Sequence, residues 1–151
     1  MSGLRLRGLC LALALVVAGA STPQAAVAPP AGPATSPLPA DATPEQIVDA
    51  QLEAYNRRDV EAFLAFYSDD AVLLKHPDVV TQTGKAEMRA RYQRSFANKD
   101  VRAEILKRIT FGRFVIDQER ITAPPAKGEK VAVAIYEIRD GKIVRVTFLD
   151  P

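Results

Sequence analysis

The segment "IVDAQLEAYNRRDVEAFLAFYSDDAVLL", residues 47–74, predicts two helices and the strand that follows them. Its first part places Gln51 and Tyr55 on one face of a helix, together with apolar side chains at helical spacing. Just before it, Thr43 is a favourable N-cap and Pro44 is a favourable first helical residue. The sequence therefore predicts a helix that begins at Pro44 and turns Gln51 and Tyr55 toward the interior.

The second half of this stretch predicts a shorter helix. Asn56 tolerates a left-handed conformation and predicts the end of the first helix, and Asp59 is a favourable N-cap for the next one. The second helix is expected to run from Val60 to about Tyr67. Phe63 and Tyr67 lie four residues apart on it, so both aromatic side chains are expected in the core.

Two short strands and a third helix are expected next. The cluster Ser68-Asp69-Asp70 predicts a turn, because short polar side chains bond to their own backbone there. "AVLL" at 71–74 and "VVTQT" at 79–83 predict strands on either side of a second turn. Gly84 then opens a helix whose apolar stripe includes Tyr92.

The period of the apolar side chains changes to two after Asn98, which is typical of strands. Gly112-Arg113 and Asp140-Gly141 predict hairpin turns, and Asp-Gly is a strong signal for a type I′ turn. Four strands are expected, over 101–111, 113–122, 130–138 and 142–149. The whole pattern predicts an α+β fold, with three helices packed in the concave face of a curved, mostly antiparallel sheet.

The N-terminus predicts export. Arg5 and Arg7 precede an apolar run of about 12 residues that ends in Ala18-Gly19-Ala20, small residues at the spacing that signal peptidase requires. A bilayer span takes roughly 20 residues, so the run is too short to cross a membrane. Residues 1–20 are predicted to be a signal peptide, with an uncleaved anchor as the alternative. The protein is then expected in the periplasm or outside the cell, free of the membrane after cleavage.

Composition separates a linker from a folded unit. Residues 21–43 are rich in Pro and Ala, which predicts a disordered linker, and the domain is expected over 44–151. Removing Arg5 and Arg7 with the signal peptide leaves 18 basic residues against 18 acidic residues. This balance offers no basic surface for nucleic acid. The one cysteine leaves with the signal peptide, so the core alone must hold the domain.

The quoted stretch, "TGKAEMRARYQRSF" at 83–96 and "YEIRDGKIVRVTFLDP" at 136–151 together resemble the nuclear transport factor 2-like superfamily. They look most like its SnoaL-like and ketosteroid isomerase-like branch. The resemblance covers essentially all of 44–151 and implies a cone with a deep pocket. That fold hosts isomerases, cyclases, hydratases, epoxide hydrolases and non-enzymatic binders, so the resemblance predicts the fold and not the reaction.

The resemblance allows the ketosteroid isomerase residues to be carried over one by one. That chemistry uses an Asp base, and a Tyr and a protonated Asp that bind the developing oxyanion. The Tyr position on the first helix holds Gln51, and the base position at the end of the first strand holds Lys75. The second Asp falls near Ala134. Because all three are replaced, very slow steroid isomerisation is expected.

Two other residues are candidate general bases. His76 follows the first strand, within one residue of the isomerase base position, and imidazole titrates near neutrality. The alternative for His76 is an exposed turn residue. Asp117 shares a strand face with Glu119, and the pKa of an acid on that face would be raised if the face lined the pocket. On the convex face an acid would pair instead with Arg108 or Arg145.

The candidate ligand-contacting residues are Gln51, Tyr55, Phe63 and Tyr92. Gln51 can donate a hydrogen bond at the pocket mouth, whereas the tyrosines are more typical of a core wall. No metal site is expected, because one histidine and scattered carboxylates lack ligand spacing. No cofactor is expected, because no glycine-rich phosphate loop is present in the sequence.

Three functions remain open. The first is an envelope protein that binds a small apolar molecule. The second is a cofactor-independent isomerase or hydratase that uses His76 or Asp117, and the third is a non-catalytic interaction or accessory module. Both faces of the later strands carry apolar residues, which predicts a homodimer through the sheet. A buried carboxylate in the cavity would favour catalysis, and an apolar cavity would favour binding.

Overall fold

A computed structural model of the chain describes residues 38–122 and 129–150. The predicted signal peptide and most of the predicted linker lie outside the described residues. Within the described ranges the chain forms three helices and one six-stranded sheet. No helix in these ranges is long and apolar enough to cross a membrane.

The sheet has the strand order β2-β1-β6-β5-β4-β3. Its strands are β1 (Tyr67–Lys75), β2 (Val79–Thr83), β3 (Arg102–Phe111), β4 (Phe114–Thr122), β5 (Glu129–Arg139) and β6 (Lys142–Leu149). Neighbouring strands are antiparallel except β1 and β6, which are parallel. The predicted α+β class with a mostly antiparallel sheet is confirmed.

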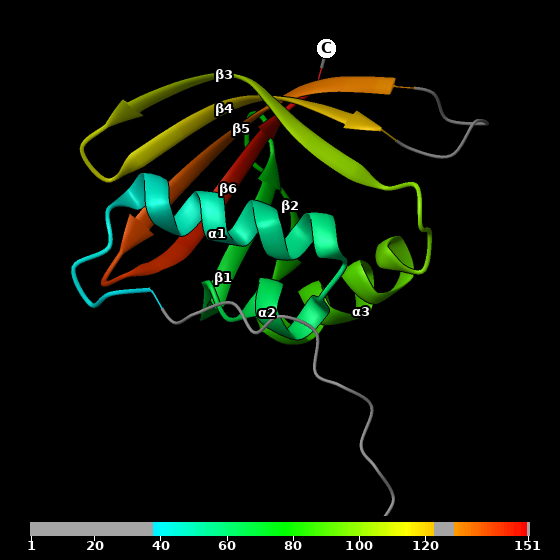
Figure 1. The fold of residues 1–151 in the computed structure, drawn as a ribbon, viewed down its shortest axis with the longest axis horizontal. Helices are drawn as coiled ribbons and strands as arrows, with labels where there is room; N and C mark the ends of the chain where they lie inside the picture. Colours follow the sequence, from blue (N-terminus) through cyan, green and yellow to red (C-terminus); the bar gives the residue numbers. More distant parts are fainter. Residues whose placement is uncertain (1–37, 123–128, 151) are drawn as a thin grey trace, which may run out of the picture. The chain divides into compact units, whose positions relative to one another are not determined.

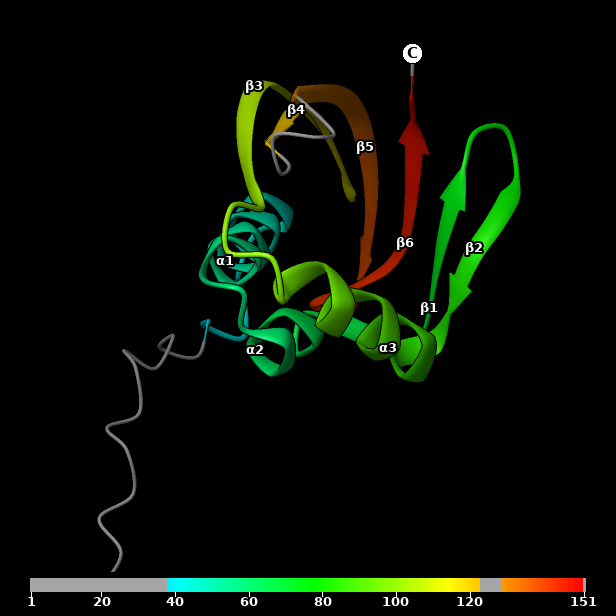
Figure 2. The ribbon, with the colours of Figure 1, turned by 90° about the vertical axis from the view of Figure 1, so that its right-hand side faces the viewer.

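The helices are α1 (Pro44–Arg57), α2 (Val60–Leu64) and α3 (Gly84–Phe96). Figure 1 shows α1 lying below the curve of β3, β4 and β5, and Figure 2 shows all three helices on the concave side of the sheet. The stripe predicted on α3 is buried, with Met88, Tyr92 and Phe96 in the core. The expected packing of helices in the concave face is therefore confirmed.

Both ends of α1 are held by specific polar contacts. The Thr43 hydroxyl accepts from the Gln46 backbone N–H, and the Gln46 side chain accepts from the Thr43 N–H at 2.8 Å. The left-handed residue at the other end is Arg58, with φ 60°, and not Asn56 as expected. Asn56 stays helical, and its side-chain amide bonds the backbone N–H and C=O of Ala103 at 2.8 and 2.9 Å. This pair of bonds fastens α1 to β3.

The end of the predicted linker belongs to the folded unit. Leu38 and Ala42 are partly buried and pack against the core, although they precede α1. Thr43, the last residue of the predicted linker, is the N-cap of that helix. The domain therefore begins several residues before the predicted boundary at residue 44.

The turn predicted at Ser68-Asp69-Asp70 is wrong, because these residues belong to β1. The strand begins at Tyr67, which pairs with Ile143 of β6, and its register is irregular before it becomes continuous. Pairing with a distant strand supplies backbone partners that override the local turn preference. The Asp69 side chain is 96% exposed and forms an ion pair with Lys85 at 2.8 Å.

Both hairpin turns are confirmed. Asp140 and Gly141 have φ values of 49° and 71°, the positive pair that a type I′ turn requires. Gly112, with φ 57°, makes the turn between β3 and β4. These two turns set the registers of β3 with β4 and of β5 with β6, which carry most of the concave face.

Candidate functional site

A cavity of about 490 Å³ lies between α1, α3 and the concave face of the sheet. Its wall combines apolar, aromatic and charged side chains. The α1 and α3 residues that line it are Gln51, Leu52, Tyr55, Arg91, Tyr92, Arg94 and Ser95. The others are Tyr67, Lys75, Thr81, Ala103, Glu119, Ile121, Lys130, Ala132, Tyr136, Phe148 and Asp150. The cavity is therefore not wholly apolar.

Glu119 is the buried carboxylate of this cavity. Strand alternation in β4 places it on the concave face with Asp117, and only 5% of its surface is exposed. The Tyr136 hydroxyl donates a hydrogen bond of 2.6 Å to Glu119 Oε1. Burial raises the pKa of Glu119 to about 7, although the hydrogen bond from Tyr136 and the charge of Arg108 act in the opposite direction. A carboxyl group of this kind can take up and release a proton near neutral pH.

Tyr136 reaches Glu119 diagonally across two strands. Glu119 lies opposite Ala132 in the β4–β5 register, whereas Tyr136 lies opposite Val115. Ala132 and Ala134 are the buried residues between them on this face of β5. Their small side chains leave room for the phenol ring to lie along the concave surface toward the carboxylate.

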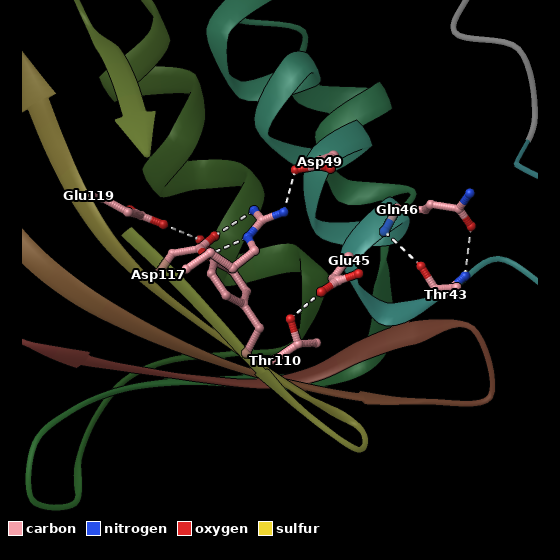
Figure 3. A network of polar contacts seen from close by, with 9 residues as sticks. Thr43, Glu45, Gln46, Asp49, Thr110, Asp117 and Glu119 are labelled. Carbon is pink, nitrogen blue, oxygen red and sulfur yellow. Dashed lines mark hydrogen bonds and ion pairs between the residues drawn. The ribbon is translucent and has the colours of Figure 1, made fainter. Parts of the chain in front are cut away.

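Asp117 has a different role from its neighbour. Its two oxygens accept from Nε and Nη2 of Arg108 at 2.7 and 2.8 Å, and Arg108 Nη1 donates to Asp49 Oδ1 of α1 at 2.6 Å. Figure 3 shows Asp117 and Glu119 side by side on β4, with Asp49 approaching from α1. Asp117 is fully buried and does not line the cavity. Pairing with Arg108 was expected only on the convex face; that expectation is wrong, because both residues lie on the concave side.

Gln51 and Tyr67 form a second buried polar pair in the wall. Gln51 Nε2 donates to the Tyr67 hydroxyl at 3.2 Å. Gln51 Oε1 is buried without a hydrogen-bond partner among the described residues. A buried acceptor without a donor is costly, so this oxygen is suited to a donor supplied by a bound molecule. Burial raises the pKa of Tyr67 well above its usual range, which keeps the phenol neutral.

Three of the four predicted ligand-contacting residues, Gln51, Tyr55 and Tyr92, line the cavity. Burial, with the nearby Glu119 charge, raises the pKa of Tyr55 to about 12, although Arg91 lowers it. Phe63 is not in the wall. Its ring packs behind it, with its centroid 4.4 Å from that of Tyr92, and its surface is fully buried.

His76 lies outside the cavity wall. It is exposed in the turn after β1, and its backbone N–H donates to Phe148 O at 2.8 Å. Lys75, one residue earlier, does line the cavity. The structure therefore brings neither predicted base, His76 or Asp117, into the lining.

The sequence reasoning missed three residues of the site. Glu119 was placed on the face of Asp117 but was not chosen, although the alternation in "VIDQER" treats the two acids alike. Tyr136 lies two residues after Ala134, the position reached by the family comparison, and on the same face. Tyr67 was expected only in the core. In the part of the chain that the structure describes, no group of three or more His, Cys, Asp or Glu side chains could hold a metal ion.

Comparison with solved structures finds similar folds. A cystatin fold protein from Novosphingobium aromaticivorans has a TM-score of 0.66 at 27% identity, over 71% of this chain and 97% of that chain. An NTF2-like protein from Cytophaga hutchinsonii has a TM-score of 0.62 at 14% identity, over 72% and 90%. A protein from Catenulispora acidiphila with a ketosteroid isomerase-like fold, in complex with trimethylamine, has a TM-score of 0.58 at 19% identity, over 71% and 85%.

Comparison of sequences identifies the family. No curated protein matches the chain. The sequence model of the SnoaL-like domain matches residues 48–146, which include all three helices almost entirely and most of the sheet. The chain therefore belongs to the SnoaL-like domain family.

Proposed function

We propose that the chain is a cofactor-independent proton-transfer enzyme, an isomerase or hydratase, that binds a small and largely apolar molecule in its cavity. Glu119 is the acid–base group. The observation that carries this proposal is a carboxylate that is 5% exposed, lines the cavity and accepts a 2.6 Å hydrogen bond from Tyr136. An ionisable group in such a setting favours chemistry over simple binding.

Glu119 replaces His76 and Asp117 as the proposed base. In its ionised form it takes a proton from a carbon next to a carbonyl group, and in its protonated form it returns that proton to another carbon. Tyr136 occupies one carboxylate oxygen, Oε1, which leaves the other oxygen for the substrate. Asp117 has both oxygens occupied by Arg108, so it holds β3, β4 and α1 together instead.

The tyrosines of the wall are suited to bind the oxygen that becomes negative in this reaction. Burial is the first cause that raises the pKa of Tyr55, Tyr67 and Tyr92, so all three remain neutral phenols at physiological pH. A neutral phenol can donate a hydrogen bond to an enolate oxygen, and such a donor is most effective where water is excluded. Gln51 holds the Tyr67 hydroxyl in position.

The test follows exchange of hydrogen for deuterium next to a carbonyl group. Purified protein is incubated in deuterium oxide with a panel of cyclic ketones, including 1-tetralone and a 5-ene-3-ketosteroid, and proton NMR measures the loss of the α-hydrogen signal. Glu119→Gln keeps the shape of the side chain and is expected to abolish enzyme-dependent exchange. His76→Ala, which lies outside the wall, is the control and is expected to retain it. Equal exchange by the wild type and Glu119→Gln would contradict the proposal.

Binding without chemistry is the second candidate. The observation in its favour is Gln51 Oε1, a buried acceptor that would gain a partner from a ligand hydroxyl or amide. A binding protein would hold such a ligand with little change of affinity in Glu119→Gln and without any α-exchange. That combination of results distinguishes the two functions.

Export and self-association are part of the proposal. Mass spectrometry of protein from its native envelope is expected to find a chain that begins at or near Ser21, and a mass that retains residues 1–20 would contradict export. Ile109 and Phe111, on the convex side of β3, are 63% and 77% exposed, which supports a homodimer through the sheet. Sedimentation is expected to show a dimer that Phe111→Glu dissociates.

A further inference from the structure

The cavity wall carries more positive than negative charge. Four of its lining side chains are cationic, Lys75, Arg91, Arg94 and Lys130, whereas two are carboxylates, Glu119 and Asp150. The whole chain is nearly balanced, with a formal charge of +2. The excess is therefore concentrated where a ligand would sit.

The two lysines share one carboxylate. Lys75 Nζ lies 3.0 Å from Asp150 Oδ2, and Lys130 Nζ lies 2.6 Å from Asp150 Oδ1. This cluster joins the ends of β1, β5 and β6 at one side of the cavity. Because one carboxylate pairs with two ammonium groups, the cluster keeps one positive charge, which explains only part of the positive excess.

Arg91 and Arg94 account for the rest. They lie three residues apart on α3, a spacing that places both side chains on one side of the helix. Neither forms an ion pair with a carboxylate of the described residues, whereas Arg89 on the same helix contacts Glu61 at 2.8 Å. On α3, the arginine outside the cavity is therefore paired with a carboxylate, whereas the two arginines that line the cavity are not.

Hydroxyl donors also line the cavity beside α3. Tyr92 and Ser95 come from the same helix and also line the cavity, and Tyr55 of α1 packs against Tyr92, with ring centroids 6.3 Å apart. Burial raises the pKa of Tyr92, and Arg91 acts against it through its charge and a hydrogen bond. Arg91 therefore lies beside the buried Tyr92, although its own side chain is exposed, and its guanidinium can form charge-assisted hydrogen bonds with a ligand.

We propose that the substrate of this cavity carries an anionic group, a carboxylate or its equivalent, which binds to Arg91 and Arg94 on the α3 side while the reacting carbon lies at Glu119. This inference rests on the proposed function and adds the substrate class. The apolar body of the molecule lies against Ile121, Ala132 and Phe148 on the sheet side.

The test compares an acid with its neutral ester. The probes are 6-hydroxy-2-naphthoate and methyl 6-hydroxy-2-naphthoate, whose fluorescence reports binding to the full protein. The wild type is expected to bind the acid at least about tenfold more tightly than the ester, as one charge-assisted hydrogen bond allows. Arg91→Gln is expected to remove most of that preference by weakening the acid alone, and Arg91→Lys is expected to retain part of it. Added salt should weaken the binding of the acid and leave the binding of the ester unchanged.

Arg89→Gln is the matched control, because it removes the same charge from the same helix outside the cavity. It is expected to keep the preference for the acid. Glu119→Gln is also expected to keep the preference for the acid, but to lose α-hydrogen exchange. A failure of the anion site can therefore be distinguished from a failure of Glu119 as the base. Three results would overturn the anion site. They are an ester that binds as tightly as the acid, an equal loss of preference in Arg89→Gln and Arg91→Gln, and no binding of the acid up to about 1 mM.

Discussion

The Tyr136 hydroxyl lies 2.6 Å from Glu119 Oε1 and donates a hydrogen bond to it across the concave face of β4 and β5. Both residues are buried, and the phenol stays neutral because burial raises its pKa well above the usual range. The bond favours the ionised carboxylate, whereas burial favours the protonated one. These are the two largest effects, and together with the smaller effects of the Asp117 and Arg108 charges they place the pKa of Glu119 at about 7.

Replacing Tyr136 by Phe removes that hydrogen bond and keeps most of the ring volume. The pKa of Glu119 is expected to rise above about 7, because a hydrogen bond that lowers it is lost while burial, which raises it, remains. Carbon-13 NMR of the labelled carboxyl group measures this pKa directly. A pKa that stays the same or falls in Tyr136→Phe would show that the hydrogen bond does not hold the carboxylate.

The raised pKa of Glu119 also makes the stability of the fold depend on pH. Below about pH 4.5 the folded and unfolded states both hold the proton, and between that pH and about 7 only the folded state does. The contribution of Glu119 to stability is therefore lost as pH rises through this window, by up to about 3 kcal/mol, and is level above it. Urea unfolding is expected to show Glu119→Gln gaining stability relative to the wild type from pH 4.5 to 7. A constant difference across that range would rule out the raised pKa.

Arg108 is expected to matter far more for stability than Arg120 on the next strand. Arg108→Met leaves Asp117 as a fully buried, unpaired carboxylate, which is expected to cost about 3–5 kcal/mol. Arg120 pairs at the surface with Glu104 and is 39% exposed, so Arg120→Met is expected to cost less than about 1 kcal/mol. Chemical denaturation measures both variants. Similar losses in the two would mean that the Arg108–Asp117 pair does not anchor the sheet.

Two N-terminal truncations test where the domain begins. A chain that starts at residue 38 is expected to melt at the same temperature as a chain that starts at Ser21, as the composition of 21–37 predicts. A chain that starts at Pro44 loses the Thr43 cap, worth about 1 kcal/mol, and the packing of Leu38 and Ala42. It is expected to melt several degrees lower. Equal melting temperatures for the chains that start at residues 38 and 44 would show that the domain begins at residue 44, as the sequence predicts.

Local signals in the sequence were enough for most of the fold. Thr43 and Asp59 cap α1 and α2, and Asp140-Gly141 makes its hairpin, because each depends on neighbouring residues alone. The start of β1 was missed because it depends on the pairing of Tyr67 with Ile143, which is distant in the sequence. No local preference of a Ser-Asp-Asp cluster indicates such a partner.

The site was less predictable from the sequence, because its residues are far apart in the chain and come together only when the strands pair and the helices pack on them. Alternation placed Asp117 and Glu119 on one face, but Arg108 and Asp49, from two other elements, decide which of them remains in the cavity wall. His76 was chosen for its closeness to the isomerase base position. An offset of one residue is enough to remove a side chain from the cavity face of a strand, as Lys75 and His76 illustrate.

If Glu119 transfers a proton in the cavity, the rate of α-hydrogen exchange must depend on pH through the ionisation of its carboxyl group. Exchange of the ketone panel in deuterium oxide is followed by NMR from about pH 5 to 9 for the wild type, Glu119→Gln and His76→Ala. We expect a rate that rises through an apparent pKa of about 7 in the wild type and His76→Ala, and no enzyme-dependent rate in Glu119→Gln. Rates that are the same in the wild type and Glu119→Gln for every ketone, or that vanish in His76→Ala, would contradict this role of Glu119.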